Sequence, residues 1–570
     1  MKFPQSKFNI IILTSLIAHL IASYFSKGWL NADEQSCILE FVNHKLGFSS
    51  DLCFLNYNNG IVTDSSLLIR SWFQPFIYFL ISKISLFLNI SNFFTITFIL
   101  KFISSLVGFL SIYLFYFATK DIFNKDKVKY YYLILTFLFW FYPLLHSRTS
   151  AENLSTSFFL IAISYYFFNQ YKFNFWKLFL VGIFLGTTFI LRYNLGISVF
   201  FFLLWIFIFE KQNLSQKLKN LIYIILGIFL LLISEHIINL WGFGEYKNID
   251  KVNFLNLFWH LERIPSLQFF LYVNSNNFYG DPGWSQHPIL GYFYLILFKF
   301  YPPISFLIII GMIFFWIKNP KSLILWLTLP YFLIHSLIQH KELRYIYPLL
   351  VFSPFFICYF IDRLNLNKKL IKIFINFIIV LNFLGFVFFL FSSQTGDLKI
   401  LNKIYNSKIQ NIYYLVSEKS VENYESLNPF NIKNITTNYY FKFNQISYYQ
   451  EINKIETKMR EGFCQKSDCV KFEHRILKEN NYYVNLELIK NKNNKKIYLK
   501  DISDKEYLEK ITKKFNSFLY KYLIYTKDEY AIKLFNNNKN CNLISSKYPL
   551  FIYNLSPSRI KNQVLYECEN

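Results

Sequence analysis

The sequence is poor in charged residues and has no motif for a nucleotide cofactor. Only 16% of its 570 residues are charged, whereas 54% are hydrophobic, a fraction that a soluble domain of this size rarely reaches. It contains no Gly-x-Gly-x-x-Gly loop, no Walker A string and no Asp-x-Asp pair of the kind that holds a metal ion and a sugar nucleotide. We therefore expect no essential metal or cofactor, although a missing motif does not exclude a divalent metal ion.

Acidic residues are also scarce, with 35 Asp and Glu against 59 Lys and Arg and a formal net charge of +24. In a soluble protein this excess would suggest nucleic acid. In a membrane protein the cytoplasmic loops carry an excess of Lys and Arg, so we expect membrane lipids and no nucleic acid as partners. The run from Phe8 to Tyr24 has no small-residue cleavage site after it, which predicts a first membrane helix that is not cleaved.

Apolar runs predict an α-helical polytopic membrane protein. A span needs about 20 apolar residues, and this length predicts about eleven spans. The expected spans are residues 8–24, 96–118, 130–146, 153–169, 177–190, 194–209, 220–240, 302–317, 322–338, 345–361 and 370–392. Two further runs, 72–90 and 287–300, would raise the number to about thirteen if they cross.

The distribution of Lys and Arg favours two juxtamembrane helices over two further spans. All basic short loops fall on the cytoplasmic side only if 72–90 and 287–300 do not cross. A transmembrane domain over 1–393 then has outer loops at 25–95 and 241–301. The tail 394–570 alternates like a strand at Tyr482–Ile489 and resembles a helix near Lys505–Tyr522. We expect it to form a small mixed α/β domain outside the cytoplasm.

The cysteines favour the same orientation. Cys37 and Cys53 lie in the first outer loop, and four more lie in the tail: Cys464, Cys469, Cys541 and Cys568. Only Cys358 lies in an expected span, and no cytoplasmic loop has any. An even number in each outer region suits an oxidising compartment; Cys37–Cys53 and Cys464–Cys469 are possible pairs, and chance placement is the alternative.

Six strings on the outer side carry candidate site residues. Asp33 and Glu34 follow the first span, where one carboxylate is a candidate general base and the alternative is a solvated loop. Arg70 and Trp72 precede the run 72–90, and both are equally typical of interfacial anchors. The remaining candidates are Arg148 and Arg192 at helix ends, Tyr279 and Trp284 in the second outer loop, and His340, Lys341, Glu342 and Arg344.

The last string is the most informative, because an exposed turn rarely needs four ionisable groups between two spans. Its cations are suited to a lipid phosphate, and Glu342 to orienting one of them. Arg148 and Arg192 should face a polar cavity or the interface, because a charge at mid-bilayer costs about 3 kcal/mol on insertion scales; snorkelling is their alternative role. Tyr279 and Trp284 suit either stacking on a sugar or packing.

In their order along residues 30–350, these strings resemble the dolichol-phosphate-mannose-dependent mannosyltransferases of glycosyltransferase family 22, in the GT-C superfamily. Asn31 to Glu34 look like the family's His-Pro-Asp-Glu string, with Asn-Ala in place of His-Pro. Arg70, Ser71, Trp72 and Pro75 match its Arg-Ser-Trp/Tyr-x-x-Pro string. Arg148-Thr149, Arg192 and the Phe278-Tyr279-Gly280 string with Trp284 are similar to later motifs. His340, Lys341, Glu342, Arg344, Tyr345 and Pro348 match the His-Lys-Glu-x-Arg-Phe/Tyr-x-x-Pro signature.

The resemblance implies an inverting mannosyl transfer from a polyprenyl (dolichyl) phosphate donor to a glycan or glycolipid acceptor. Asp33 would be the base, Glu34 its support, and Lys341, His340 and Arg344, with Arg192, would bind the lipid phosphate. We expect a multi-pass protein of a bacterial inner membrane or the endoplasmic reticulum, with its site on the periplasmic or lumenal face. A GT-C enzyme for another sugar, a lipid or solute transporter, and a non-catalytic scaffold are the alternatives.

Overall fold

The computed structural model divides the chain into two compact units. The first consists of Met1–Ser26, Leu30–Ile90 and Phe98–Ser392, and the second of Lys27–Trp29, Ser91–Thr97 and Ser393–Asn570. The structure describes residues 5–26, 34, 38–46, 57–58, 61–62, 70–169, 173–243, 287–364, 369–391, 400, 403–404, 406–409, 411–416, 442–443, 485–489, 496–501, 520–526, 529–546, 550 and 562–569.

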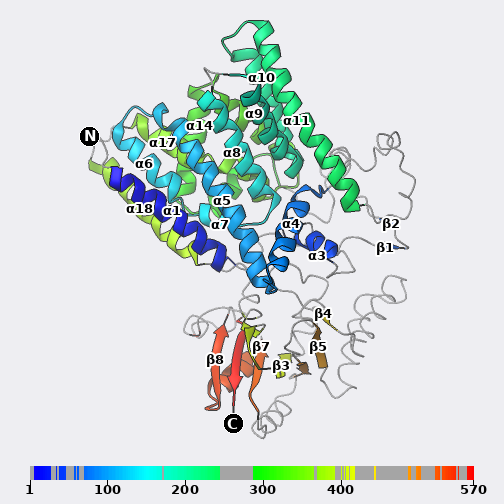
Figure 1. Cartoon of the computed structure of the whole chain (residues 1–570). Coiled ribbons are helices and arrows are strands. Elements are labelled where there is room, and N and C mark those ends of the chain that lie inside the picture. The colour runs from blue at the N-terminus through cyan, green and yellow to red at the C-terminus, as the bar shows by residue number, and fades with distance from the viewer. Residues whose placement is uncertain are drawn as a thin grey trace. The chain divides into compact units, whose positions relative to one another are not determined.

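The first unit is helical (Figure 1). Its longer helices are α1 (Gln5–Phe25), α4 (Phe73–Phe87), α5 (Phe93–Thr119), α6 (Asp126–Phe137), α8 (Ala151–Asn169), α9 (Phe175–Leu191), α10 (Gly196–Phe209), α11 (Leu214–Phe243), α13 (Gly291–Lys299), α14 (Ile304–Lys318), α15 (Leu323–Leu337), α17 (Ser353–Arg363) and α18 (Lys369–Leu390). The shorter elements are α3 (Glu40–Lys45), η3 (Lys120–Ile122), α7 (Tyr142–His146), η4 (Tyr193–Leu195), η8 (Leu343–Ile346), α16 (Tyr347–Leu350) and the hairpin strands β1 (Tyr57–Asn58) and β2 (Ile61–Val62).

Each expected span contains at least one of these helices, so the chain is a multi-pass membrane protein. Within the described residues, four helices are long and apolar enough to cross a membrane, or up to six if each bent pair is one span. The four are Ser6–Phe25, Phe94–Ile122, Leu214–Gly242 and Lys369–Leu390. The total of eleven spans stays a prediction.

Two expected spans are broken rather than continuous. The span expected over 130–146 is interrupted between α6 and α7, where Pro143 begins a new helix. The side chain of Asn382, on α18, accepts a hydrogen bond from Trp140 N (3.1 Å) and donates one to the Leu138 carbonyl (2.7 Å). Irregular backbone is tolerated in a membrane where neighbouring helices satisfy its polar groups, and Asn382 does this here. The span expected over 345–361 bends by 53° where Pro354 starts α17.

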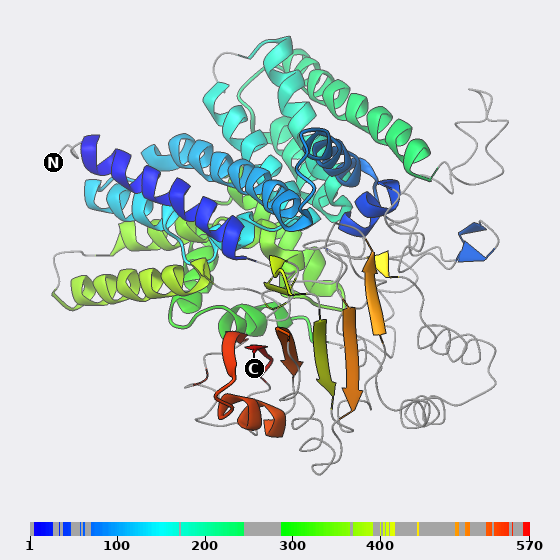
Figure 2. The ribbon, with the colours of Figure 1, turned by 60° about the horizontal axis from the view of Figure 1, so that its bottom comes forward.

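Small residues allow α9 and α11 to pack closely along one edge of the unit (Figure 2). A Cβ added at Gly182 would lie 2.1 Å from the Ile224 carbonyl oxygen, and one at Gly227 would lie 2.3 Å from the Phe179 carbonyl oxygen. Small residues spaced in this way let helix backbones approach in a membrane. α9 itself begins at Asn174, whose side chain accepts a hydrogen bond from Lys177 N at 2.9 Å.

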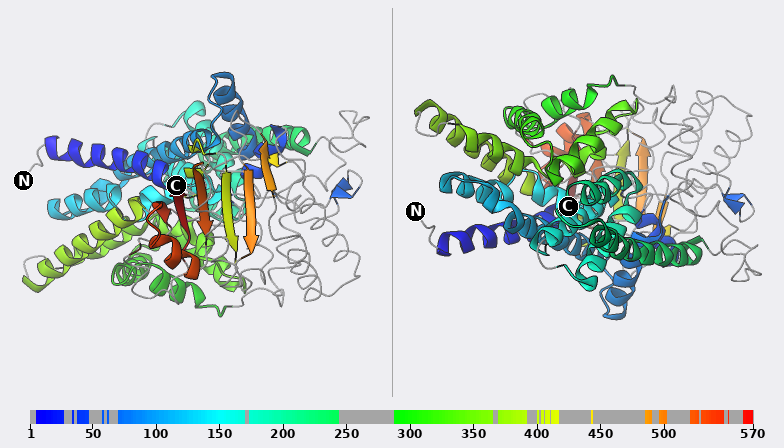
Figure 3. Two further views of the ribbon diagram at one scale, coloured as in Figure 1. Left: turned by 90° about the horizontal axis from the view of Figure 1, so that it is seen from below. Right: turned by 90° about the horizontal axis from the view of Figure 1, so that it is seen from above.

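The second unit contains a seven-stranded sheet with the order β4-β5-β6-β3-β7-β9-β8 (Figure 3). The strands are β3 (Asn411–Val416), β4 (Lys442–Phe443), β5 (Asn485–Ile489), β6 (Lys496–Asp501), β7 (Tyr522–Thr526), β8 (Cys541–Ser546) and β9 (Val564–Cys568), and helix α25 (Glu529–Asn536) follows β7. β3 is parallel to β6 and β7, and the other pairs are antiparallel.

The second unit can be compared with the strand, helix and cysteine predictions made for the tail. β5 lies within the segment expected to be a strand, whereas the expected helix near Lys505–Tyr522 falls largely outside the described residues, and Tyr522 itself begins β7. A disulfide joins Cys541 and Cys568, which face each other across β8 and β9. Cys37, Cys53, Cys464 and Cys469 lie outside the described residues, and Cys358 is a buried free thiol.

Candidate active site

The predicted site residues that the structure describes lie at helix ends of the first unit. Residues 147–150 connect α7 to α8, Arg192 follows α9, and residues 338–342 connect α15 to η8. Polar residues at or next to these three places, together with residues from the end of α1, from α4 and α5 and Glu34, form two clusters. We call them the Glu34 cluster (Ser26, Glu34, Gln74, Lys101, Arg148 and Thr149) and the arginine cluster (Glu152, Arg192, His340, Glu342, Arg344 and Tyr345).

In the Glu34 cluster one buried carboxylate is held by the segment that precedes α8. Glu34 Oε1 accepts hydrogen bonds from Thr149 N (2.9 Å) and Thr149 Oγ1 (2.8 Å), and Oε2 lies 3.8 Å from Arg148 Nη1. Glu34 is 1% exposed and Arg148 is fully buried. Arg148 Nη2 also donates to the Ser26 carbonyl at 2.5 Å, so this cation joins the end of α1 to the acidic string.

Two further buried residues complete the Glu34 cluster. Lys101 Nζ donates to the same Ser26 carbonyl at 2.6 Å, and Gln74 Nε2 donates to the Thr149 carbonyl at 2.8 Å. Both side chains lie inside segments that hydropathy assigns to apolar helices, α5 and α4. An ionisable residue inside such a helix normally marks a functional or paired position, and this signal could have identified Lys101 from the sequence.

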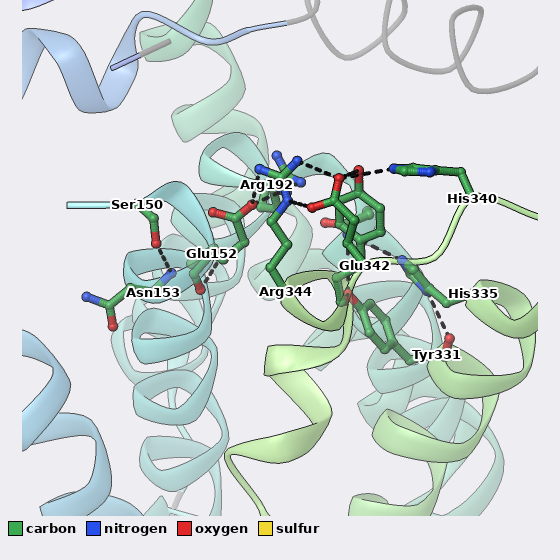
Figure 4. Close-up of polar contacts among 12 residues, drawn as sticks. Ser150, Glu152, Asn153, Arg192, Tyr331, His335, His340, Glu342 and Arg344 are labelled. Carbon is green, nitrogen blue, oxygen red and sulfur yellow. Dashed lines mark hydrogen bonds and ion pairs between the residues drawn. The ribbon is translucent and has the colours of Figure 1, made fainter. Parts of the chain in front are cut away.

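In the arginine cluster two guanidinium groups share one carboxylate (Figure 4). Glu152 Oε1, in the first turn of α8, lies 3.1 Å from Arg192 Nη2 and 3.8 Å from Arg344 Nη1. Arg344 also pairs with Glu342, with Nε 2.5 Å from Oε2 and Nη2 3.1 Å from Oε1. His340 Nε2 lies 3.0 Å from the same Glu342 Oε1.

An aromatic ring supports both arginines. The Cζ atoms of Arg192 and Arg344 lie 5.7 Å and 5.2 Å from the centre of the Tyr345 ring, within the range of cation–π attraction. Tyr345 Oη also donates to Glu342 at 3.4 Å. The cluster is therefore fixed by three chain segments, and its guanidinium groups are already oriented.

The two clusters belong to one region of the molecule. Thr149, which binds Glu34, precedes Glu152 by three residues, so their Cα atoms are at most about 11 Å apart. The phenol of Tyr347, at the start of α16, lies within electrostatic range of Glu34, Arg148, Glu152 and Arg344. The acidic string after the first span and the cationic string before α16 thus meet around residues 148–152.

Electrostatics favour an ionised Glu342. Burial raises its pKa, but Arg344 and the hydrogen bonds from Arg344 and His340 outweigh this, so the pKa of Glu342 lies below its ordinary value. Burial lowers the pKa of Lys341. The Lys341 ammonium donates to the carbonyls of Ile338 and His287 and lies 5.8 Å from the Tyr292 ring centre, so here it anchors the start of α13.

Trp72 is not exposed at an interface but buried. Its side chain is 1% exposed and stacks on Phe41 with ring centres 4.4 Å apart. Trp72 N donates to Asn239 Oδ1 at 2.8 Å, and a Cβ at Gly242 would lie 2.1 Å from the indole. The end of α11 therefore holds the Arg70–Trp72 string at the start of α4.

A further buried acid, Glu235, is linked to the Arg70 string through Tyr193. The guanidinium of Arg70 lies within electrostatic range of the phenol of Tyr193. This phenol donates a hydrogen bond to Glu235 of α11. Glu235, which is 4% exposed, was not among the residues that motif strings identified.

The remaining predicted residues, Asp33, Tyr279 and Trp284, lie outside the described residues. Within the part of the chain that the structure describes, no group of three His, Cys, Asp or Glu side chains could hold a metal ion. The motif strings gave Glu152 no role, because the sequence does not reveal that two arginines from other segments converge on it.

Comparison with known proteins agrees with the motif strings. The sequence model of the Alg9-like mannosyltransferase family matches residues 10–426, which include every candidate site residue. This match confirms the family inferred from the strings. No curated protein matches the chain.

Solved structures of ArnT from Cupriavidus metallidurans are among those similar to the chain. The structure bound to undecaprenyl phosphate has 8% sequence identity and a TM-score of 0.47, with 99% of this chain and 98% of that chain covered. The structure in the apo state has the same identity and coverage and a TM-score of 0.46.

Proposed function

The chain belongs to the Alg9-like mannosyltransferase family, and from this membership we propose that it transfers mannose from a polyprenyl-phosphate-mannose donor to a glycan or glycolipid acceptor. Family membership shows that the protein is a membrane glycosyltransferase. The identity of its donor, the identity of its acceptor and the membrane face on which it acts are our proposals. The donor phosphate binds at the arginine cluster and the acceptor approaches from the Glu34 cluster.

The observation that carries this proposal is the pair of buried arginines, Arg192 and Arg344, with their guanidinium groups on one side of Glu152 (Figure 4). Guanidinium groups bind phosphate through paired hydrogen bonds, which a lipid-linked phosphate needs at a membrane protein. The absence of sugar-nucleotide motifs from the sequence also favours a lipid-linked donor.

The reaction is a single displacement with inversion at the anomeric carbon. The acceptor oxygen forms a bond to that carbon as the bond to the phosphate oxygen breaks. The hydroxyl proton passes to Asp33, and the polyprenyl phosphate leaves with one additional negative charge. Arg192 and Arg344 stabilise this charge as it develops, which is the effect that accelerates the step. Glu34, held by Thr149 and Arg148, fixes the backbone beside Asp33.

Two observations support an active site on the extracytoplasmic face. The Cys541–Cys568 disulfide is typical of an oxidising compartment. The basic short loops fall on one side when α4 and α13 are juxtamembrane helices. α4 suits that position, because Ile84 and Phe87 on it are 59% and 85% exposed.

The test is an incubation of membranes containing the protein with polyprenyl-phosphate-mannose carrying an isotopic label. We expect a product heavier by one labelled hexose, and no product when labelled GDP-mannose is offered to the purified protein. Transfer from the nucleotide alone would contradict the proposal. A pentose or another hexose accepted in preference to mannose, measured with matched donors, would reject mannose while leaving the lipid donor in place.

A further inference from the structure

The arginine cluster holds two glutamates that differ in burial and in their partners. The Glu152 side chain is 5% exposed, and a single oxygen, Oε1, faces both Arg192 and Arg344. The Glu342 side chain is 30% exposed and faces Arg344 together with His340. Both are anions where a phosphate would bind, so their presence requires an explanation.

We propose that the two carboxylates have different functions. Glu152 is a positioning residue that holds Arg192 and Arg344 throughout the reaction, whereas Glu342 occupies the position of the donor phosphate and leaves it when the donor binds. This inference rests on the proposed function, because it requires a donor that carries a phosphate.

The contacts of Glu342 are those that a phosphate would use. Its Oε1 accepts a hydrogen bond from Arg344 Nη2 at 3.1 Å, and its Oε2 forms an ion pair with Arg344 Nε at 2.5 Å. Arginine binds phosphate with a similar pair of contacts to two oxygens. His340 Nε2 and Tyr345 Oη, at 3.0 Å and 3.4 Å, complete the set. A phosphate that replaces the carboxylate keeps every donor satisfied, so no buried charge is left without a partner during the exchange.

Glu342 is also able to move. It lies in the segment between α15 and η8 and has extended backbone (φ −121°, ψ 144°), and its side chain is the most exposed of the charged groups in the arginine cluster. A change of side-chain rotamer is enough to turn such a carboxylate toward solvent. No helix has to shift, and Arg344 keeps its contact with Glu152.

Glu152 cannot leave in the same way. It lies in the first turn of α8, where the helix dipole favours an anion, and its partners come from two other segments. Without its charge, the two guanidinium groups over the Tyr345 ring would lose the carboxylate that they share. Loss of the Glu152 carboxylate therefore changes the positions of the Arg192 and Arg344 guanidinium groups.

Polar groups without a protein partner lie beside the cluster. Among the described residues, the hydroxyl of the fully buried Tyr292, which lies within electrostatic range of Glu342, makes no hydrogen bond. Oδ1 of Asn194, two residues after Arg192, has none either. Buried polar groups are almost always paired, and these two suit the oxygens or water shell of a bound donor head group.

The experiment compares four variants of the full-length protein in detergent or nanodiscs: Glu342→Gln, Glu152→Gln, Glu152→Asp and Glu210→Gln. Glu210, which is 8% exposed at the end of α10, is the matched control for loss of a buried carboxylate. For each variant we would measure kcat and the donor KM with polyprenyl-phosphate-mannose, and the inhibition constant of sugar-free polyprenyl phosphate.

We expect opposite results for the two glutamates. Glu342→Gln should lower the donor KM and the inhibition constant, by roughly 3- to 10-fold, because a charged competitor for Arg344 is removed. Glu152→Gln should raise the donor KM and lower kcat/KM by at least about 10-fold, since both arginines lose their partner. Glu152→Asp should restore part of the loss, and Glu210→Gln should match the wild type.

Either of two results would overturn the inference. A donor KM that rises in Glu342→Gln would mean that Glu342 orients Arg344 for the donor and does not compete with it. A Glu152→Gln variant with wild-type kinetics would remove the positioning role. If the Glu152 variants do not fold, as judged by gel filtration, Glu342→Gln alone decides the matter. A wild-type protein that takes sugar from no lipid phosphate would instead reject the proposed function itself.

Discussion

At the scale of single residues, three buried arginines each pair with a carboxylate. Arg148 pairs with Glu34, Arg192 with Glu152, and Arg344 with Glu342. Removing one partner of such a pair leaves an uncompensated buried charge, which is strongly destabilising. These pairs are therefore both structural supports and the groups that would meet a charged substrate, and variants must separate the two effects.

Arg344→Ala tests the phosphate contact. The substitution removes a charged hydrogen-bond donor to the phosphate, worth about 1.5–3 kcal/mol, so we expect the donor KM to rise roughly 10- to 100-fold. Steady-state kinetics with varied donor at saturating acceptor measure this. Arg363→Ala, at the end of α17 and against Tyr359, is the control and should change the donor KM little. An unchanged donor KM in Arg344→Ala would remove this residue from the phosphate site.

Asp33→Asn tests the base. Loss of a general base costs about 10²- to 10⁴-fold in rate, so kcat should fall by that amount while the variant still inserts and elutes as the wild type does in gel filtration. Asp64→Asn, in the same outer loop, is the matched control. Near-normal transfer by Asp33→Asn would mean that a group other than Asp33 takes the proton from the acceptor hydroxyl.

The ionised form of Glu342 should make stability depend on pH. Because its pKa in the folded protein lies below the ordinary value of 4.5, its contribution is fully present above that value and is lost as the pH falls through the folded-state pKa. We expect the difference in Tm between the wild type and Glu342→Gln to be largest near neutral pH and to shrink as the pH falls below 4.5 and through the lower folded-state pKa. Thermal unfolding in detergent over this pH range is the measurement. A Tm difference between the two proteins that does not change with pH would mean that Glu342 is not ionised in the folded protein.

At the scale of helices, packing depends on glycines and on one asparagine. Gly182 and Gly227 let α9 and α11 approach to backbone contact, and Asn382 satisfies the backbone where α6 ends. The apolar runs predicted where the helices lie, because apolar length is a property of the local sequence. They did not predict the break after Phe137, because the group that stabilises it lies in α18, far along the chain.

Gly182→Ala tests the contact between α9 and α11. The added methyl group would lie 2.1 Å from a backbone carbonyl, which cannot rotate away, so we expect a loss of stability of about 1–3 kcal/mol. Gly385→Ala is a milder control, because its Cβ would meet the Trp140 side chain at 3.2 Å. Thermal unfolding of both variants in one detergent would show equal stability if α9 and α11 were not packed in this way.

The site was predictable from the sequence only in part. The strings with Arg148, Arg192 and Arg344 identified the cations, because charges at the ends of apolar helices are rare. They did not identify Glu152 or Lys101, whose importance comes from the side chains that other helices bring to them. Trp72 was a candidate for substrate binding, with an interfacial anchor as the alternative. It is buried, and its backbone N–H donates to Asn239 of α11, a contact across 167 residues that no local pattern contains.

At the scale of the whole molecule, the chain combines a helical membrane unit with a unit built on a mixed sheet. The family match covers residues 10–426 and so reaches only the beginning of the second unit. The sheet contains the Cys541–Cys568 disulfide. A disulfide persists where the compartment is oxidising, so this bond favours the predicted extracytoplasmic location of the second unit.

A reporter fusion tests the orientation of the chain. A reporter enzyme that is active only when exported should be active when fused after Asn570 and inactive when inserted at Lys127, in a basic loop expected to be cytoplasmic. Reporter activity in intact cells, normalised to protein amount, is the measurement. The opposite pattern would put the second unit in the cytoplasm and would contradict the extracytoplasmic site.

The central claim is that buried arginines and acidic residues from distant segments form one pocket for a lipid phosphate, and an experimental structure with polyprenyl phosphate tests it most directly. We predict the phosphate within hydrogen-bonding distance of Arg192 and Arg344, Glu342 turned away from Arg344, and Asp33 facing the same pocket. A phosphate bound elsewhere, with Arg344 still on Glu342 and Asp33 in a separate cleft, would contradict the account.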